Sequence, residues 1–443
     1  MQCSRIRPVI SVVLPLWKED YIQMIGKLGE LTRVLRNRRL SRDELGALRN
    51  RRLRAVVRHA YESVPFYRSR FQSVGLHPED IRTVGDLKYI PVTKKEDLRA
   101  AGLDRILAKG VNLASCRRRR TNGSMGKPFD TYLNPHEQWI RRLLGFRRLI
   151  DIGFRPQDRV CILYDPTQLP ARRYRTKCLS PLLPVQQQVQ ELQGIQPTVL
   201  KAWPSSLQAL LHHVDYRLNE FIRPRALVTS GEICTKWLKK KIQAHMDVEM
   251  FNFYSAGEFG PIASECRAHE GLHLNADHLV LECCRNGRPV QTDESGFAVL
   301  TSLYAYTMPL IRYQLGDICT LTDRQCSCGS NLPLIEAPIG RQDEVIRMPN
   351  GKVVSVAAVV NITLRPFEGI DQFLLIQESP YDFLLRIVFT LRPAEEVLSE
   401  IRTRMVECLG KPASLDIQVV DFIRWNRGSK YKTFVSMVPQ LAS

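Results

Sequence analysis

The sequence predicts an α/β protein with a large N-terminal domain of mixed sheets and helices and a small α+β C-terminal domain. The chain has 443 residues, more than the roughly 150 of an average domain. From about residue 120, short β-rich runs alternate with helical runs, which indicates an α/β fold with a mostly parallel sheet. After Gly340 a strand-and-helix pattern starts again and ends near Leu441. We therefore expect domains at residues 1–340 and 341–443.

The elements follow from local patterns, taken in chain order. Residues 18–75 predict helices, because leucines and valines recur there at helical spacing. The run Thr93–Leu98 resembles a capped helix start. Strands are expected at Val160–Tyr164, Ala226–Ser230 and Val248–Tyr254, and helices at Pro135–Ile150, Ser205–His213 and Thr235–His245. Residues 279–325, with Gly296, Pro309 and Gly316 between apolar runs, predict a smaller β-subdomain.

Composition excludes several classes of protein. With 44% hydrophobic and 25% charged residues, the chain is neither disordered, nor collagen, nor a coiled coil. No window approaches the ~18 uninterrupted apolar residues of a membrane span. The 64 Lys+Arg against 45 Asp+Glu give 64 − 45 = +19, which favours an anionic partner such as nucleic acid, a membrane surface or a smaller anion.

The cysteines indicate a reducing compartment. Twelve cysteines in 443 residues are far below the density of a disulfide scaffold. The apolar stretch from Pro8 to Trp17 faintly resembles a signal peptide, but Pro8 and Pro15 interrupt it and charged residues follow with no small-residue cleavage site. We therefore expect a cytoplasmic protein.

One loop has the composition of a phosphate site. Thr121–Pro128 combines Gly123 and Gly126 with hydroxyl groups and Lys127, so its backbone N–H groups could cup phosphate oxygens. The spacing is not that of a P-loop. A plain surface turn is the alternative.

Four further motifs lie in turns. Glu258 follows an apolar strand, where a carboxylate could hold Mg²⁺ against phosphates. Asp317 follows Gly316 and could accept hydrogen bonds from ribose hydroxyls. Gly340–Glu344 lies at the expected domain boundary, and Arg427–Lys432 offers a lysine on a glycine-containing loop. Each motif alone is equally compatible with an ordinary loop.

Their order along the chain resembles the adenylate-forming superfamily, and in particular its phenylacetate–CoA ligase branch with its relatives in capsular polysaccharide biosynthesis. The segments Ala60–Tyr67, Ile90–Leu98, Glu265-Cys266 and Gly271–His273 are characteristic of that branch. The resemblance covers roughly residues 45–435. It implies that ATP and a carboxylic acid form an acyl-adenylate and pyrophosphate, and that a thiol (coenzyme A or a carrier protein) or an amine then displaces AMP.

The resemblance also implies residue roles. Lys430, Glu258 and Arg341 would be catalytic, with Glu258 binding Mg²⁺, Arg341 helping to close the site and Lys430 stabilising the adenylation transition state. Asp343 would be the hinge of a mobile C-terminal domain. The phosphates, adenine and ribose of ATP would be bound by Thr121, Gly123, Ser124, Gly126, Lys127, Ser230, Gly231, Glu232, Tyr254 and Asp317.

The sequence departs from the family pattern at several positions. Asn122 and Met125 stand where Ser and Thr are common, Gly257 replaces a hydroxyl residue, and Ser429 precedes Lys430 where Gly is common. Lys432 is a nearby competitor of Lys430. The rival hypothesis is therefore an impaired ligase scaffold that binds zinc and a nucleic acid or anionic surface.

A structural zinc site is expected at Cys266, His273, Cys326 and Cys328, with His269 as the rival fourth ligand and free loop cysteines as the alternative. Some members of the branch share this arrangement.

Two basic runs do not lead us to expect a nucleic-acid partner. Arg117–Arg120 would steer ATP or an anionic acceptor, or be a solvated loop, and Lys239–Lys241 is expected on a helix surface. Few aromatic residues lie between their charges, so no nucleic-acid partner is expected. The oligomeric state and the identity of the acid are left open.

Overall fold

The structure is a computed structural model. It describes residues 21–120, 129–163, 176–232, 234, 236–338, 340–341, 345–350, 353–364, 366–367, 369–389, 391–423 and 433–438. The chain divides into two compact units, residues 1–158 with 251–338 and residues 159–250 with 339–443.

The first unit begins with helices that pack into its core. Ser41 and Glu44 form a capping box at the start of α3, and Asn134 and Glu137 form one at the start of α7. The apolar residues of α7, among them Leu143 and Leu144, are buried with residues of the neighbouring sheet. The helices of this unit are α2 (Tyr21–Asn37), α3 (Arg42–Ser63), α4 (Pro65–Gln72), α5 (Lys95–Ala101), α6 (Leu103–Ile106) and α7 (Pro135–Asp151), with the 3₁₀ turns η3 (Pro78–Asp80), η4 (Val84–Tyr89) and η5 (Leu113–Ser115).

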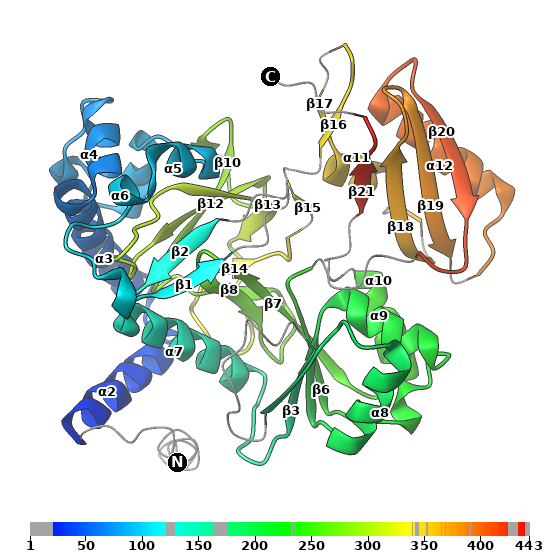
Figure 1. The fold of residues 1–443 in the computed structure, drawn as a ribbon, viewed down its shortest axis with the longest axis horizontal. Coiled ribbons are helices and arrows are strands. Elements are labelled where there is room, and N and C mark those ends of the chain that lie inside the picture. The colour runs from blue at the N-terminus through cyan, green and yellow to red at the C-terminus, as the bar shows by residue number, and fades with distance from the viewer. Residues whose placement is uncertain are drawn as a thin grey trace. The chain divides into compact units, whose positions relative to one another are not determined.

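The sheet of the first unit is antiparallel at every pairing along the order β11-β10-β12-β13-β14-β9-β8-β7. A separate hairpin joins β1 to β2. In the view of Figure 1, α7 lies below the β1–β2 hairpin. The strands are β1 (Arg117–Arg120), β2 (Asp130–Leu133), β7 (Glu249–Ala256), β8 (Gly260–Glu265), β9 (Leu272–Leu274), β10 (Leu279–Arg285), β11 (Arg288–Pro289), β12 (Ser295–Ser302), β13 (Tyr313–Thr322) and β14 (Leu334–Ile335).

The second unit contains a parallel sheet in the order β6-β5-β3-β4. Apolar residues of its helices, such as Leu192 and Leu210, share one buried cluster with strand residues such as Leu163 and Leu200. Its elements are β3 (Val160–Leu163), β4 (Thr176–Leu179), α8 (Val185–Ile195), β5 (Val199–Ala202), α9 (Pro204–His213), η7 (Leu218–Glu220), β6 (Ala226–Ser230) and α10 (Lys236–His245).

The C-terminal part of this unit has its own four-stranded sheet, in the order β20-β19-β18-β21. Ile401, Met405 and Leu409 of α12 are buried against strand residues such as Leu385. The elements are β15 (Gly340–Arg341), β16 (Val345–Arg347), β17 (Val353–Ser355), α11 (Val356–Thr363), β18 (Ile370–Gln377), β19 (Asp382–Phe389), α12 (Glu395–Leu409), β20 (Ser414–Val419) and β21 (Phe434–Ser436).

The predicted α/β fold class is confirmed, with one correction. The expectation of a mostly parallel sheet holds for β3 to β6 but is wrong for β7, which pairs antiparallel with β8. The strands of the β-subdomain expected at residues 279–325 pair antiparallel. Strand β10 is buried along nearly its whole length, so it lacks the alternation that usually marks an antiparallel strand. Helix α5 begins at Lys95 after an N-cap at Lys94, whose N–H donates to the Asp97 carboxylate. The domain division at residue 340 stays a prediction.

Among the described residues, no helix is long and apolar enough to cross a membrane.

Candidate functional site

Glu258 lies in the turn between β7 and β8, which pair up to Ala256 opposite Gly260. Its side chain is almost buried, at 6% exposure. Tyr313 of β13 donates its hydroxyl to Glu258 Oε1 at 3.1 Å, and Lys95 Nζ, at the start of α5, lies 3.3 Å from the same oxygen. Both contacts fall on Oε1, so Oε2 is the oxygen available to a ligand.

Burial, and then the Glu258 carboxylate, raise the pKa of Tyr313 well above its ordinary value. The phenol therefore stays protonated and acts as a donor to the carboxylate.

A second carboxylate is held in a similar way. Tyr254 of β7 donates its hydroxyl to Asp317 Oδ2 of β13 at 2.8 Å. Gly316, directly before Asp317, has φ +92°, a backbone conformation that glycine adopts without strain. Side chains thus join β13 to β7 and to the turn after it, through Asp317 and Tyr313, although the two strands are not neighbours in the sheet order.

The segment Ser230–Glu232 belongs to the second unit. Ser230 ends β6, and Gly231 has φ +86°. The Glu232 carboxylate accepts hydrogen bonds from the N–H and hydroxyl of Ser205 at 3.0 and 2.9 Å, at the first turn of α9. A carboxylate is favourable there because the helix N-terminus carries a partial positive charge.

Several predicted site residues lie outside the described residues. Of Arg341 only the backbone, in β15, is described. The predicted phosphate-loop residues Thr121, Gly123, Ser124, Gly126 and Lys127, the hinge residue Asp343 and the lysines Lys430 and Lys432 are not described.

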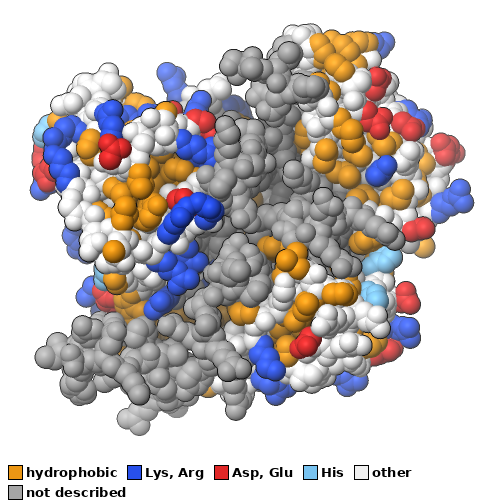
Figure 2. Space-filling view, viewed as in Figure 1, with side chains coloured by type: hydrophobic (Ala, Val, Ile, Leu, Met, Phe, Trp, Pro, Cys, Tyr) orange, Lys and Arg blue, Asp and Glu red, His pale blue; other side chains and the backbone are white. Residues whose placement is uncertain are grey.

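The basic run Arg117–Arg120 forms strand β1, so its interpretation as a solvated loop is wrong. Arg118 and Arg120 lie on the exposed side, and both form ion pairs with Asp130, at 2.6 and 3.0 Å. Figure 2 shows basic side chains gathered over the β1–β2 hairpin. Because residues alternate along a strand, Arg117 and Arg119 lie on the other, less exposed side.

Arg119 lies in a positively charged environment. Burial, and then the charges of Arg117, Arg141 and Arg142, lower its pKa to about 10. Such an environment, directly before the predicted phosphate loop, favours anionic ligands.

The structure brings the four predicted zinc ligands together. The ligand atoms of Cys266, His273, Cys326 and Cys328 all lie within 4.8 Å of one another. Cys266 and Cys326 Sγ are 3.6 Å apart, and Cys328 Sγ is 3.3 Å from His273 Nε2. His269 does not join this group. Its ring stacks on Phe251, with centroids 4.9 Å apart.

Three residues beside Glu258 were not predicted as site residues. Lys95 lies in the expected helix start Thr93–Leu98, whereas Tyr313 and Arg141 carry no motif that points to the site. Arg141 donates to the carbonyl oxygens of Gly257 and Glu258. The signal for Lys95 was the segment Ile90–Leu98 that carries the family resemblance.

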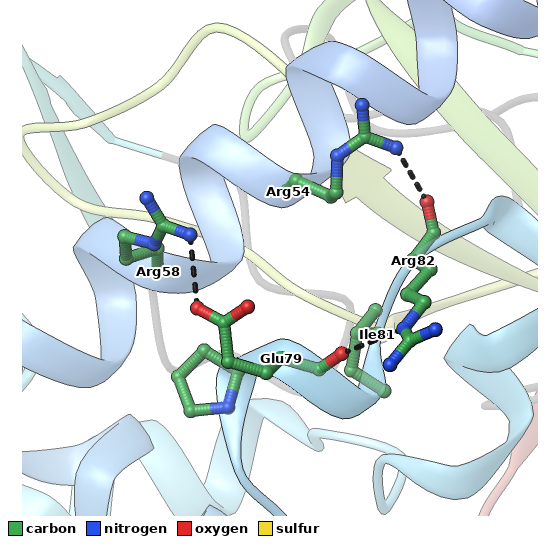
Figure 3. A pocket seen from close by; sticks show the side chains of 6 residues that line it. Arg54, Arg58, Glu79, Ile81 and Arg82 are labelled. Carbon is green, nitrogen blue, oxygen red and sulfur yellow. Dashed lines mark hydrogen bonds and ion pairs between the residues drawn. The ribbon is translucent and has the colours of Figure 1, made fainter.

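A pocket of about 290 Å³ lies elsewhere, between α3 and η3 (Figure 3). Arg58 pairs there with Glu79 at 2.9 Å, and Arg54 donates to the Arg82 carbonyl at 3.0 Å. None of the predicted site residues lines it, so it is separate from the Glu258 site. Its lining is Arg54, Arg58, Pro78, Glu79, Ile81 and Arg82.

The chain is similar to known proteins in both sequence and fold. The phenylacetate–coenzyme A ligase of Thermus thermophilus is 29% identical over 342 residues, which cover 72% of this chain and 76% of the relative. The enzyme of the same name from Escherichia coli K12 is 27% identical over 306 residues, covering 63% and 68%.

A solved structure shares the fold. A 2-hydroxyisobutyryl-CoA ligase in complex with 2-HIB-AMP has a TM-score of 0.73 at 21% identity, covering 90% of this chain and 91% of that one. No protein-family model matches the chain. The chain is thus similar in sequence to phenylacetate–coenzyme A ligases and shares its fold with a solved acyl-CoA ligase.

Proposed function

We propose that this protein activates a carboxylic acid with ATP and transfers the acyl group to the thiol of coenzyme A. The observation that carries the proposal is the pair of tyrosine-held carboxylates, Glu258 and Asp317, at motif positions where the family binds ATP. Relatives named phenylacetate–coenzyme A ligase support the acceptor. A carrier-protein thiol and an amine are the alternative acceptors.

In the first step an oxygen of the substrate carboxylate attacks the α-phosphorus of ATP. A new P–O bond forms, the bond to the bridging oxygen breaks, and pyrophosphate leaves with the electron pair. Asp317 would accept hydrogen bonds from the ribose hydroxyls, and Tyr254 would hold that carboxylate in place while packing near the adenine. Lys127 of the phosphate loop and Lys430 would offset the charge that gathers in the transition state.

Glu258 fits a magnesium ligand, because Mg²⁺ prefers carboxylate oxygens and its Oε2 is not used by Lys95 or Tyr313. When bound, Mg²⁺ neutralises negative charge on the phosphates.

In the second step the thiolate of coenzyme A attacks the acyl carbon, and AMP leaves. Residues 341–443 would act as a lid that turns about Asp343. Arg341 would help to close the site and Lys430 would leave it, making room for the acceptor.

The Cys/His cluster is proposed to hold a structural zinc ion. Tetrahedral coordination with Zn–S bonds of about 2.3 Å places sulfur atoms roughly 3.8 Å apart, close to the 3.6 Å between Cys266 and Cys326. The His273 Nδ1 lies 3.4 Å from the carbonyl oxygen of Leu332, which would orient Nε2 toward the metal. With four protein ligands the ion would join the start of β9 to the loop after β13, away from substrate.

Metal analysis of the purified protein tests the zinc proposal. We expect about one zinc per chain, and loss of the metal in Cys328→Ser. His269→Ala is the matched control and should keep its zinc. Zinc far below one per chain, or its loss in the control alone, would contradict this ligand set.

Exchange of labelled pyrophosphate into ATP, dependent on added acid, tests the proposed function. A panel of aromatic, aliphatic and hydroxy acids should reveal at least one substrate, and coenzyme A should then yield a thioester. Asp317→Asn should raise the KM for ATP, because it removes the negative charge and replaces one acceptor oxygen of the carboxylate by an NH2 donor. Absence of exchange across the panel, with salt-sensitive nucleic-acid binding instead, would favour the non-catalytic binder.

A further inference from the structure

Arg141 of α7 grips the backbone of the turn that carries Glu258. Its Nη1 donates to the carbonyl oxygen of Gly257 at 2.9 Å, and its Nη2 donates to the carbonyl oxygen of Glu258. Its Nε donates to the hydroxyl of Tyr304 at 3.0 Å. Tyr304 in turn donates to the carbonyl oxygen of Phe259 at 2.9 Å. Two side chains therefore bind three consecutive carbonyl groups.

The turn needs such partners because it lies beyond the β7–β8 pairing, which ends at Ala256 opposite Gly260. The carbonyl groups of a partly buried turn must find hydrogen-bond donors. A guanidinium offers several donors in one rigid plane and so can bind two adjacent carbonyls. Burial raises the pKa of Tyr304, so its hydroxyl stays protonated and can donate to Phe259 while it accepts from Arg141.

The sequence of the turn leaves space for this contact. Gly260 has φ +73°, and a Cβ placed there would lie 3.0 Å from Arg141 Cδ and 3.2 Å from Arg141 Cγ. A larger residue would therefore push the guanidinium aside as well as strain the backbone.

Helix α7 is itself fixed against the segment that carries Tyr304. The Glu137 carboxylate, one turn before Arg141, accepts hydrogen bonds from the N–H groups of Tyr306 and Thr307 at 2.6 and 2.7 Å. Arg141 and Tyr304 are thus presented to the turn from a rigid support, as positioning of a functional group requires.

The Glu258 residue is consequently held at both ends. Arg141 binds its carbonyl oxygen, while Tyr313 and Lys95 contact its carboxylate. We propose that Arg141 and Tyr304 are positioning residues that fix the Glu258 turn, so that its carboxylate is preorganised for the magnesium–ATP complex. This inference rests on the proposed function, and it concerns residues that reach the nucleotide only through Glu258.

Three variants, with one matched control, test the clamp, which is the set of contacts that Arg141 and Tyr304 make with the Glu258 turn. Arg141→Gln removes the guanidinium, and Arg141→Lys keeps the charge with fewer donors. Tyr304→Phe removes a single hydroxyl and replaces Arg141→Gln in the test if that variant does not fold. Arg148→Gln is the control, because Arg148 is also on α7 and contacts β7 through Ser255 Oγ at 2.9 Å and the Phe253 ring, but not the turn.

Hydrogen exchange of the backbone of residues 257–260, a range that excludes Ser255, is measured by mass spectrometry as the first readout. Opening of this segment requires breaking the clamp, so exchange should become about ten-fold faster in Arg141→Gln and less so in Tyr304→Phe. The KM for magnesium–ATP in the exchange assay is the second readout. The KM for magnesium–ATP should rise about ten-fold in Arg141→Gln and by a smaller factor in Arg141→Lys. The KM for the acid should stay unchanged in both variants.

The inference is overturned if Arg141→Gln and Arg148→Gln give the same exchange in residues 257–260. It is also overturned if Arg141→Gln changes the KM for the acid as much as the KM for magnesium–ATP. Should the wild-type protein catalyse no acid-dependent reaction, the proposed function fails. The hydrogen-exchange comparison then still decides whether the clamp exists.

Discussion

Replacement of Arg147 by methionine should destabilise the first unit strongly. Arg147 of α7 is 1% exposed, and its guanidinium contacts the Asp277 carboxylate at 2.8 and 2.9 Å. It also donates to the Val34 carbonyl at 3.1 Å and to the Asn275 side chain. The pair joins the C-terminal half of α7 to the loop between β9 and β10. The same helix carries Arg141, which binds the Glu258 turn.

The size of the effect follows from the distance. Two unit charges 2.8 Å apart attract by about 6 kcal/mol at an effective dielectric constant of 20. Desolvation of both charges offsets much of this in the intact pair. Methionine leaves the Asp277 carboxylate buried without its cation, and breaking a buried pair in this way costs roughly 3–5 kcal/mol. We expect the free energy of unfolding to fall by that amount.

The fall in the free energy of unfolding is measured by urea unfolding, followed through hydrogen exchange in peptides from α7 and β10. These peptides report on the first unit separately. A double-mutant cycle with Asp277→Asn isolates the pair, because the double variant has no orphan charge. The double variant should be less destabilised than the sum of the single variants by about 2–3 kcal/mol. A loss below about 1 kcal/mol in Arg147→Met, or additive single effects, would refute the reasoning.

Two further predictions concern stability at low pH and the role of Lys430. Burial alone would raise the pKa of the Asp277 carboxyl, but Arg147 and then His278 outweigh it and hold that pKa well below its usual value. The stabilisation is therefore present above the unfolded pKa of about 3.9 and is lost as pH falls from there toward the folded pKa. When unfolding is measured between about pH 3 and 6, the free energy of unfolding should fall more steeply with decreasing pH in wild type than in Asp277→Asn. Lys430→Ala should slow adenylation by about 10²–10³-fold with ATP binding retained; loss in Lys432→Ala instead would place the catalytic lysine two residues later.

Local patterns predicted most elements because their signals are local. Helix α7 begins at Pro135, where the Asn134–Glu137 capping box and an amphipathic run agree. The parallel strands β3 and β6 were visible as short apolar runs between helices. The antiparallel order of β7 to β14 was not visible, because which strands pair depends on contacts distant in sequence.

The candidate site was predicted where a motif carries the residue and missed where a tertiary contact does. Glu258 and Asp317 both stand beside glycines in recognisable motifs, Glu258 in a turn and Asp317 within β13. Lys95 reaches Glu258 from 163 positions earlier in the chain, and only the fold brings its Nζ to 3.3 Å. Arg141 lies on a helix that also carries Arg142 and Arg148, and nothing in the sequence distinguishes the arginine that meets the turn.

The fate of the arginines explains why net charge is a poor guide to the partner of this protein. Arg312 is 1% exposed, and beside its ion pair with Glu282 it donates to the carbonyl oxygens of Lys88, Ile90 and Gly287. Arg141 likewise binds carbonyl oxygens. A carbonyl satisfies a guanidinium without cancelling its charge. Arg141 therefore adds one to the +19 of the chain while its donors hold the Glu258 turn, whereas the charge of Arg312 is balanced by Glu282. Arginines that bind backbone carbonyl oxygens raise the net charge without needing a polyanionic partner. The net charge is therefore compatible with a protein whose ligands are a nucleotide and a small acid.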